Sequence, residues 1–142
     1  MRDVQALYDK LTDSGVKLYL WDLGDASATT IAIDGAYGIF MDFDNIETAA
    51  DELCVVAHEA GHFFSGATHR VDSPLDVVGR HECKANKWAI AHCIPVDDLD
   101  DAVADGCTEW WQLAERLGVT ESFVKKAVCL YTYGNLADEL YF

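Results

Sequence analysis

The chain has 142 residues, about half of them hydrophobic, and a formal net charge of −15. A chain of this length can form one domain around one hydrophobic core, so we expect residues 1–142 to be a single domain. No apolar run is long enough to span a membrane. The strong negative charge repels nucleic acid and anionic lipid, and therefore argues against both as partners.

The five cysteines argue against a disulfide framework. Their number is odd and none of them forms a C-x-x-C pair, so a zinc ribbon is also not expected. The N-terminal residues show no apolar segment of a signal peptide. Reduced thiols and the absence of a leader together predict a cytoplasmic protein.

The first third of the chain predicts one helix and three strands. Apolar residues at helical spacing predict a helix over Val4–Leu11. Strand-forming residues follow over Val16–Leu23, Thr29–Ile33 and Tyr37–Phe43. The Asp34-Gly35 pair between the last two is a strong hairpin signal. We expect these strands to form an antiparallel sheet.

The remainder of the chain is predicted to be helical. A long helix, capped by Asn45 or Thr48, extends to about Ser65. Ser73-Pro74 opens another helix that ends before Pro95. Three shorter helices are expected over 97–105, 108–117 and 120 to about 131. The predicted fold class is α+β, with a small three-stranded antiparallel sheet packed on the long helix and a helical C-terminal half.

The long helix contains His58-Glu59-Ala60-Gly61-His62, which has the pattern H-E-x-x-H. Residues four apart on a helix lie about 40° apart around its axis, so both imidazoles project from one face. This geometry suits two ligands of a tetrahedral zinc ion. Glu59 lies beside them and can accept a proton from an attacking water. Small residues at 60 and 61 allow another backbone to approach closely.

A zinc site of this kind needs a third protein ligand, and several residues downstream are candidates. His69 resembles the end of the metzincin pattern but is one residue too far along, and no methionine follows it. Asp72 or Asp76 would make an aspartate-type site. Glu82 is the strongest candidate because it lies on a second helix, 20 residues after His62. Asn86 is one turn further, where its amide can accept a hydrogen bond from a ligand imidazole.

The segments 56–62 and 82–89, followed by Ile94-Pro95, resemble the ImmA/IrrE family of small metallopeptidases. The second segment reads E-x-x-A-N-x-x-A and is the more discriminating, because many zincins share H-E-x-x-H. Trp88 stands where the family usually has phenylalanine. His81 and Cys83 flank the proposed ligand and are potential competitors for the metal.

The resemblance implies a zincin-like fold and a zinc endopeptidase of bacteria, phages or mobile elements. By position, it implies His58, His62 and Glu82 as ligands and Glu59 as the general base. The family's typical substrate is a helix-turn-helix repressor, which is cut to derepress genes. The charge of −15 suits a basic protein partner of this kind.

Two other functions remain open. One is a regulatory module that binds a repressor without cutting it. The other is a DNA-binding protein, because residues 108–131 have helix-turn-helix spacing. Residues 108–130 carry three acidic and three basic side chains, however, whereas DNA binding normally needs a basic surface.

The substrate contacts are less defined by the sequence. His69, Tyr131 and Tyr133 are candidates to stabilise a developing oxyanion or contact substrate, as is His92. The strand at 37–42 directly precedes the motif helix. We predict it as a sheet edge to which an extended substrate could add as a further strand.

Overall fold

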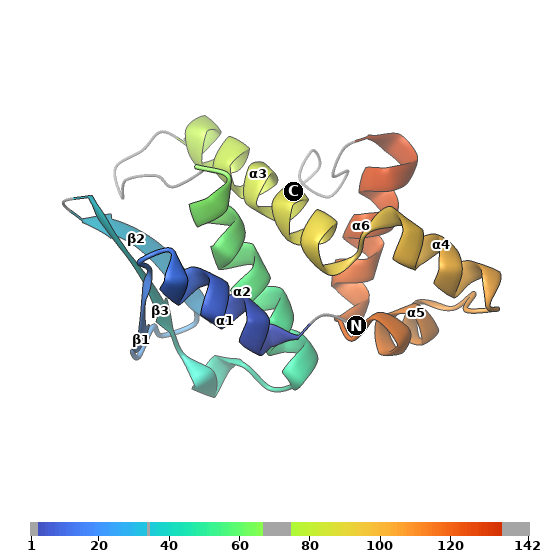
Figure 1. The fold of residues 1–142 in the computed structure, drawn as a ribbon, viewed down its shortest axis with the longest axis horizontal. Coiled ribbons are helices and arrows are strands. Elements are labelled where there is room, and N and C mark those ends of the chain that lie inside the picture. Colours follow the sequence, from blue (N-terminus) through green and yellow to red (C-terminus); the bar gives the residue numbers. More distant parts are fainter. Residues whose placement is uncertain (1–2, 34, 67–74, 135–142) are drawn as a thin grey trace.

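The computed structural model describes residues 3–33, 35–66 and 75–134. Within them the elements are, in chain order, α1 (Val4–Asp13), β1 (Lys17–Leu20), β2 (Ala28–Ile33), β3 (Ala36–Met41), the 3-10 turn η1 (Phe43–Asn45), α2 (Ala49–Phe64), α3 (Leu75–Cys93), α4 (Val96–Ala104), α5 (Trp110–Leu117) and α6 (Glu121–Tyr133) (Figure 1). The α+β class and the helical C-terminal half are as predicted. Ser73-Pro74, the predicted start of α3, lies outside the described residues.

Side-chain caps decide where several of these helices begin. The Asp51 backbone N–H donates to the Thr48 hydroxyl at 3.0 Å, so Thr48 caps α2. Asn45 instead belongs to η1, and its amide donates to the carbonyls of Gly24 and Ala26 at 2.8 Å each. Thr120 caps α6 by accepting from the Phe123 N–H at 3.2 Å. The choice left open between two α2 caps is thus settled.

The sheet is mixed, and the prediction of a purely antiparallel sheet was wrong. Its order is β1-β3-β2, with β2 antiparallel to β3 and β1 parallel to it. The predicted hairpin is present, but β3 is the central strand and β1 and β2 form the edges. The prediction of 37–42 as an edge strand was therefore also wrong, because both sides of β3 are already paired.

The connection between β1 and β2 explains this topology. Leu20 of β1 and Ala28 of β2 both lie beside Met41, so residues 21–27 cross over the end of β3. The Asp42 carboxylate accepts from the Leu23 N–H at 3.0 Å, and the Asp42 N–H donates to the Ser27 carbonyl at 2.9 Å. These tertiary contacts hold the crossing, which local sequence patterns do not encode.

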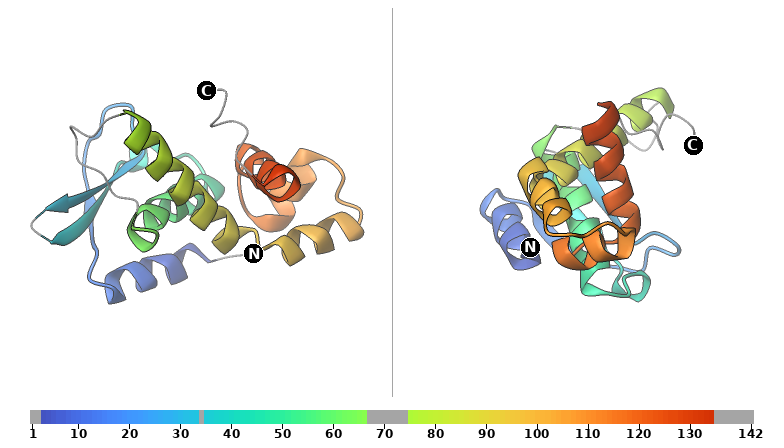
Figure 2. Two further views of the ribbon diagram at one scale, coloured as in Figure 1. Left: turned by 90° about the horizontal axis from the view of Figure 1, so that it is seen from above. Right: turned by 90° about the vertical axis from the view of Figure 1, so that its right-hand side faces the viewer.

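Helix α2 runs through the middle of the molecule. The sheet and α1 lie towards one end, and α4 to α6 lie at the other (Figures 1 and 2). One hydrophobic cluster joins both ends through α2 and α3; its fully buried members include Leu7, Leu11, Ile39, Val56, Ala57, Ala60, Ala89, Ile90, Ile94, Val124 and Ala127. Burial of this apolar cluster is the main force holding the elements together.

Gly61 allows α2 and α3 to approach each other closely. A Cβ atom at this position would overlap the Ala85 backbone, lying 2.9 Å from both its carbonyl carbon and its Cα. The prediction that small residues in the motif admit another backbone is confirmed. Farther along the same interface, Phe64 stacks on Trp88 with ring centroids 5.2 Å apart. Tryptophan at position 88 therefore has a packing role.

Two expectations about the whole chain can be compared with the described residues. None of their helices is both long and apolar enough to cross a membrane. The five cysteines all lie in the described residues, and none of them is joined to another by a disulfide bond.

Candidate metal centre and active site

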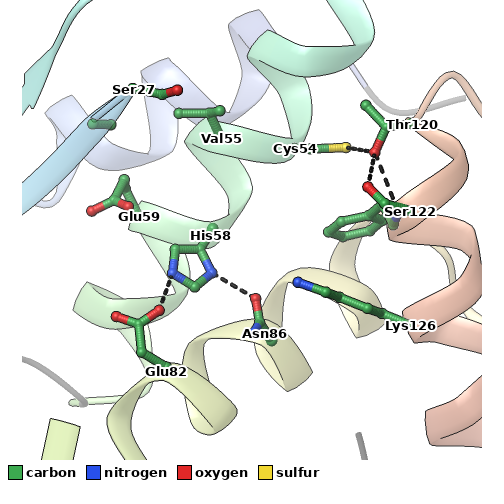
Figure 3. Close-up of a pocket in the computed structure, with 12 residues that line it drawn as sticks. Ser27, Cys54, Val55, His58, Glu59, Glu82, Asn86, Thr120, Ser122 and Lys126 are labelled. Atoms are coloured by element: carbon green, nitrogen blue, oxygen red, sulfur yellow. Dashed lines mark hydrogen bonds and ion pairs between the residues drawn. The ribbon is translucent and has the colours of Figure 1, made fainter. Parts of the chain in front are cut away.

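Helices α2 and α3 bring His58, His62 and Glu82 together. Figure 3 shows His58 facing Glu82. The two Glu82 oxygens lie 2.7 Å from His58 Nε2 and 3.0 Å from His62 Nε2. The two imidazole Nε2 atoms are 3.2 Å apart. Among the described residues this is the one group of three side chains arranged to hold a metal ion. His81 and Cys83 do not belong to it.

The arrangement fits a tetrahedral ion. Zinc bonds of about 2.0–2.1 Å place neighbouring ligand atoms about 3.3 Å apart. The separation of 3.2 Å between the two imidazole nitrogens already matches this value. The two shorter distances to Glu82 are those of hydrogen bonds, and an opening of a few tenths of an ångström would admit the ion. Two imidazoles and one carboxylate are also a common ligand set for catalytic zinc.

Asn86 orients the first of these imidazoles. Its side chain is buried, and Oδ1 lies 2.6 Å from His58 Nδ1. An amide oxygen can only accept, so His58 donates its Nδ1–H to Asn86, and in the neutral ring Nε2 then carries the lone pair that a metal ion would take. This tautomer is the one that a metal ligand needs. Asn86 thus lies where sequence spacing placed it, one helical turn beyond Glu82.

The two histidines also stabilise the ionised form of Glu82. Partial burial alone would raise the pKa of its carboxyl group. The hydrogen bonds and charges of His58 and His62 outweigh this effect and hold the pKa well below the usual range of a glutamic acid. The carboxylate is therefore ionised, as metal ligation requires.

Glu59 is buried beside this cluster and is oriented by the sheet. It is 7% exposed, and its Oε1 accepts a hydrogen bond of 2.8 Å from the Thr30 hydroxyl of β2. The same hydroxyl lies 3.4 Å from the Glu59 backbone carbonyl. Glu59 is not part of the metal-binding group, and its carboxylate is held where it can act as a base.

His58, Glu59, Glu82 and Asn86 line a cleft of about 390 Å³. One side, which we call the metal-side wall, consists of residues from the start of β2, α2 and α3: Ser27, Ala28, Cys54, Val55, His58, Glu59, Glu82 and Asn86. The facing side, which we call the α6 wall, consists of Thr120, Ser122, Phe123 and Lys126. Figure 3 shows Lys126 extending from α6 towards Asn86 and His58.

Of the other sequence-predicted residues, the described ones Tyr131, Tyr133 and His92 do not line this cleft. The Tyr131 hydroxyl donates to the Ile94 carbonyl at 2.6 Å, and Tyr133 is 70% exposed near the end of α6. His92 stacks on Trp88 with ring centroids 5.0 Å apart. His69 and Asp72 lie outside the described residues, as does the side chain of Asp76.

Sequence reasoning missed two residues of the site: Lys126, which lines the cleft, and Thr30, which bonds Glu59. Thr30 was noted only as part of a strand, and Lys126 only as one charge of a helix pair. No local pattern marks either residue, because each reaches the site through tertiary packing. The alternation of side chains along β2 gave the one available signal, since it predicts that half of them face α2.

Comparison with known proteins identifies the family. Neither a curated protein nor a solved structure matches the chain. The family model described as the IrrE N-terminal-like domain, of peptidase family M78, matches residues 43–128. That range is more than half of the chain and contains α2, α3 and the α6 wall. The predicted resemblance is confirmed: the chain belongs to the ImmA/IrrE family of M78 metallopeptidases.

Proposed function

We propose that the chain is a zinc-dependent endopeptidase, with the ion held by His58, His62 and Glu82 and with Glu59 as the general base. One observation carries the proposal. Two imidazoles and a carboxylate converge within hydrogen-bonding distance of each other, and a second, buried carboxylate lies beside them in an open cleft. A metal site with a purely structural role would not need Glu59 or access to solvent.

The positions of the side chains suggest a separate role in hydrolysis for each of them. Zinc in this site would polarise the scissile carbonyl and lower the pKa of a water molecule towards about 7. Glu59 accepts the proton of the attacking water and passes it to the leaving amine. Thr30 keeps the Glu59 carboxylate aimed into the cleft, and Asn86 keeps the His58 ring in the ligating tautomer.

Strand β2 offers an extended substrate a place to bind. It is an edge strand, and within the described residues only β3 pairs with it. Its first residue, Ala28, lines the cleft with Ser27, and Thr30 bonds Glu59. A peptide added along its free edge would gain backbone hydrogen bonds and run past the catalytic groups. β2 thus takes the role that sequence reasoning gave to residues 37–42.

The substrate we propose is a basic protein, and a helix-turn-helix repressor is the family's typical example. The net charge of −15 accelerates encounter with a basic partner, and salt weakens this effect. The same charge disfavours DNA. A gel-shift titration at low salt should show no sequence-specific binding, and submicromolar binding there would favour the helix-turn-helix alternative.

The decisive experiment compares zinc-loaded protein with its Glu59→Gln variant on a repressor encoded beside its gene. The variant keeps the volume of the side chain but removes the base, so cleavage should fall by orders of magnitude while zinc content stays the same. Glu115→Gln on the exposed side of α5 is the matched control and should cleave normally. Equal turnover by the Glu59 variant would refute the general-base role. Repressor binding without cleavage by the wild type would favour the regulatory module.

A further inference from the structure

We propose that Lys126 and the α6 wall form a subsite for an acidic side chain, aspartate or glutamate, of the peptide substrate. This inference rests on the proposed peptidase function and adds a specificity to it. Lys126 is the cationic side chain that lines the cleft opposite the metal-binding group. It extends from α6 across the cleft towards Asn86 (Figure 3).

Lys126 has no partner among the described carboxylates. The ion pairs recorded in the described residues are His58–Glu82, His62–Glu82 and Arg116–Asp105. The neighbouring Lys125 is exposed and lies over the Trp110 ring, 5.9 Å from its centroid. Lys126 is half-buried instead, within a chain that has 25 acidic residues against 10 lysines and arginines. A partly desolvated ammonium with no ion-pair partner among the described residues is suited to bind an anion.

The local charge balance leaves Lys126 available to the substrate. Glu59 and Glu82 contribute two negative charges to the cleft. A divalent ion bound by the metal-side wall would offset both, so the charge of Lys126 would remain unbalanced. A carboxylate on the substrate would neutralise it.

The position of Lys126 favours recognition of a side chain over stabilisation of the reacting oxygen. His58 turns Nε2 towards Glu82 and Nδ1 towards Asn86, so the two sides of its ring face different parts of the cleft. Lys126 approaches on the Asn86 side (Figure 3). A substrate residue flanking the scissile bond would meet the ammonium there, while the reacting carbonyl would lie on the Nε2 side.

The test uses the zinc-loaded protein and a positional library of quenched peptides with glutamate, glutamine or lysine fixed at each position. We expect glutamate at one position to raise kcat/KM about tenfold or more over glutamine, because a charge-assisted hydrogen bond is lost with the amide. Lys126→Glu should invert the preference towards lysine at that same position. Lys125→Glu changes the net charge equally and should leave the preference unchanged.

The outcomes separate this inference from the proposed function. Cleavage by the wild type without a charge preference would overturn the acidic subsite. An equal fall in kcat for all peptides in Lys126→Gln would also overturn it, and would assign Lys126 to stabilisation of the oxyanion. Binding of the same peptides to immobilised Glu59→Gln protein, measured as the amount of each peptide retained, is a second readout that does not depend on cleavage. The wild type could fail to cleave any peptide and still retain glutamate peptides in a way that depends on Lys126. In that case the subsite stands and the peptidase proposal fails. Charge-independent retention would overturn the subsite.

Discussion

The two walls of the cleft are built differently. On the metal-side wall, short polar contacts fix each functional side chain: Thr30 holds Glu59 at 2.8 Å, and Asn86 holds His58 at 2.6 Å. On the α6 wall, Phe123 is buried in the core and Thr120 and Ser122 bond each other at 3.2 Å, but no ion pair among the described residues includes Lys126. Cys54 Sγ of the metal-side wall and Thr120 Oγ1 of the α6 wall lie 3.8 Å apart.

This difference fits the proposed roles of the two walls, reaction on the metal side and substrate recognition on the α6 side. Groups that hold a metal or move a proton must be preorganised, because small displacements from reacting geometry cost rate. Groups that select a substrate can keep their hydrogen-bonding capacity free until the substrate arrives. Substitutions on the metal-side wall should therefore affect all substrates alike, whereas substitutions on the α6 wall should discriminate among them.

The largest effect is expected from removing the α3 ligand. Glu82→Ala should bind zinc more than about 100-fold more weakly than the wild type, since even the loss of a residue that only orients a ligand costs about 10–100-fold. Elemental analysis after dialysis against a chelator measures this, with about one zinc per chain expected in the wild type. If the variant kept its zinc while His69→Ala lost it, the ligand assignment would be wrong.

Gly61→Ala tests how strongly the metal-side wall depends on helix contact. The added methyl meets the Ala85 backbone, so we expect a loss of about 2 kcal/mol of folding stability despite the better helix propensity of alanine. Gly79→Ala is the matched control in α3, because nothing lies within 4 Å of its added Cβ. Thermal or denaturant unfolding should show the control equal to or more stable than the wild type. Similar stabilities for both variants would contradict the close approach of α2 and α3.

Thr30→Val should lower kcat about tenfold for every substrate, because the Glu59 carboxylate loses a charge-assisted hydrogen bond. KM and zinc content should change little. Thr30→Ser keeps the hydroxyl and should restore most of the rate. If kcat of Thr30→Ser fell as far as kcat of Thr30→Val, the methyl group of Thr30, and not its hydroxyl, would be the group that matters.

The smallest effect is expected behind the metal-side wall, where the Tyr8 hydroxyl donates to Glu52 at 2.6 Å. Burial, the hydrogen bond to Glu52 and its negative charge all raise the pKa of Tyr8 above its usual value of 10.0. A raised pKa means that the fold favours the protonated phenol, so the contribution to stability is present below pH 10 and lost above it. Tyr8→Phe should cost about 1 kcal/mol at neutral pH. The difference in unfolding free energy between wild type and variant should shrink above pH 10, and a difference that grew there would refute the assignment.

Elements with strong local signals were predicted well. The helix around residues 58–62, the hairpin of β2 and β3, and the end of α3 before Pro95 all appear in the structure. Periodicity and turn residues act over a few positions, so one sequence is enough to read them. The convergence of the two histidines with Glu82 was also predicted, because a helix fixes its own side-chain directions and the motif spacing leaves few alternatives.

The sheet order and the far side of the cleft could not be read from the sequence. Whether β1 pairs with β2 or with β3 depends on contacts between Asp42 and residues 23–27, which are distant in sequence. The contact of Thr30 with Glu59 and the position of Lys126 opposite His58 could not be read from the sequence either. Both arise only when the sheet and α6 pack on α2. The sequence by itself indicated the candidate metal-binding residues, since two helices carry all of them. Tertiary packing decided which strand is open to a substrate and which charge faces it, because these depend on how distant segments share one core.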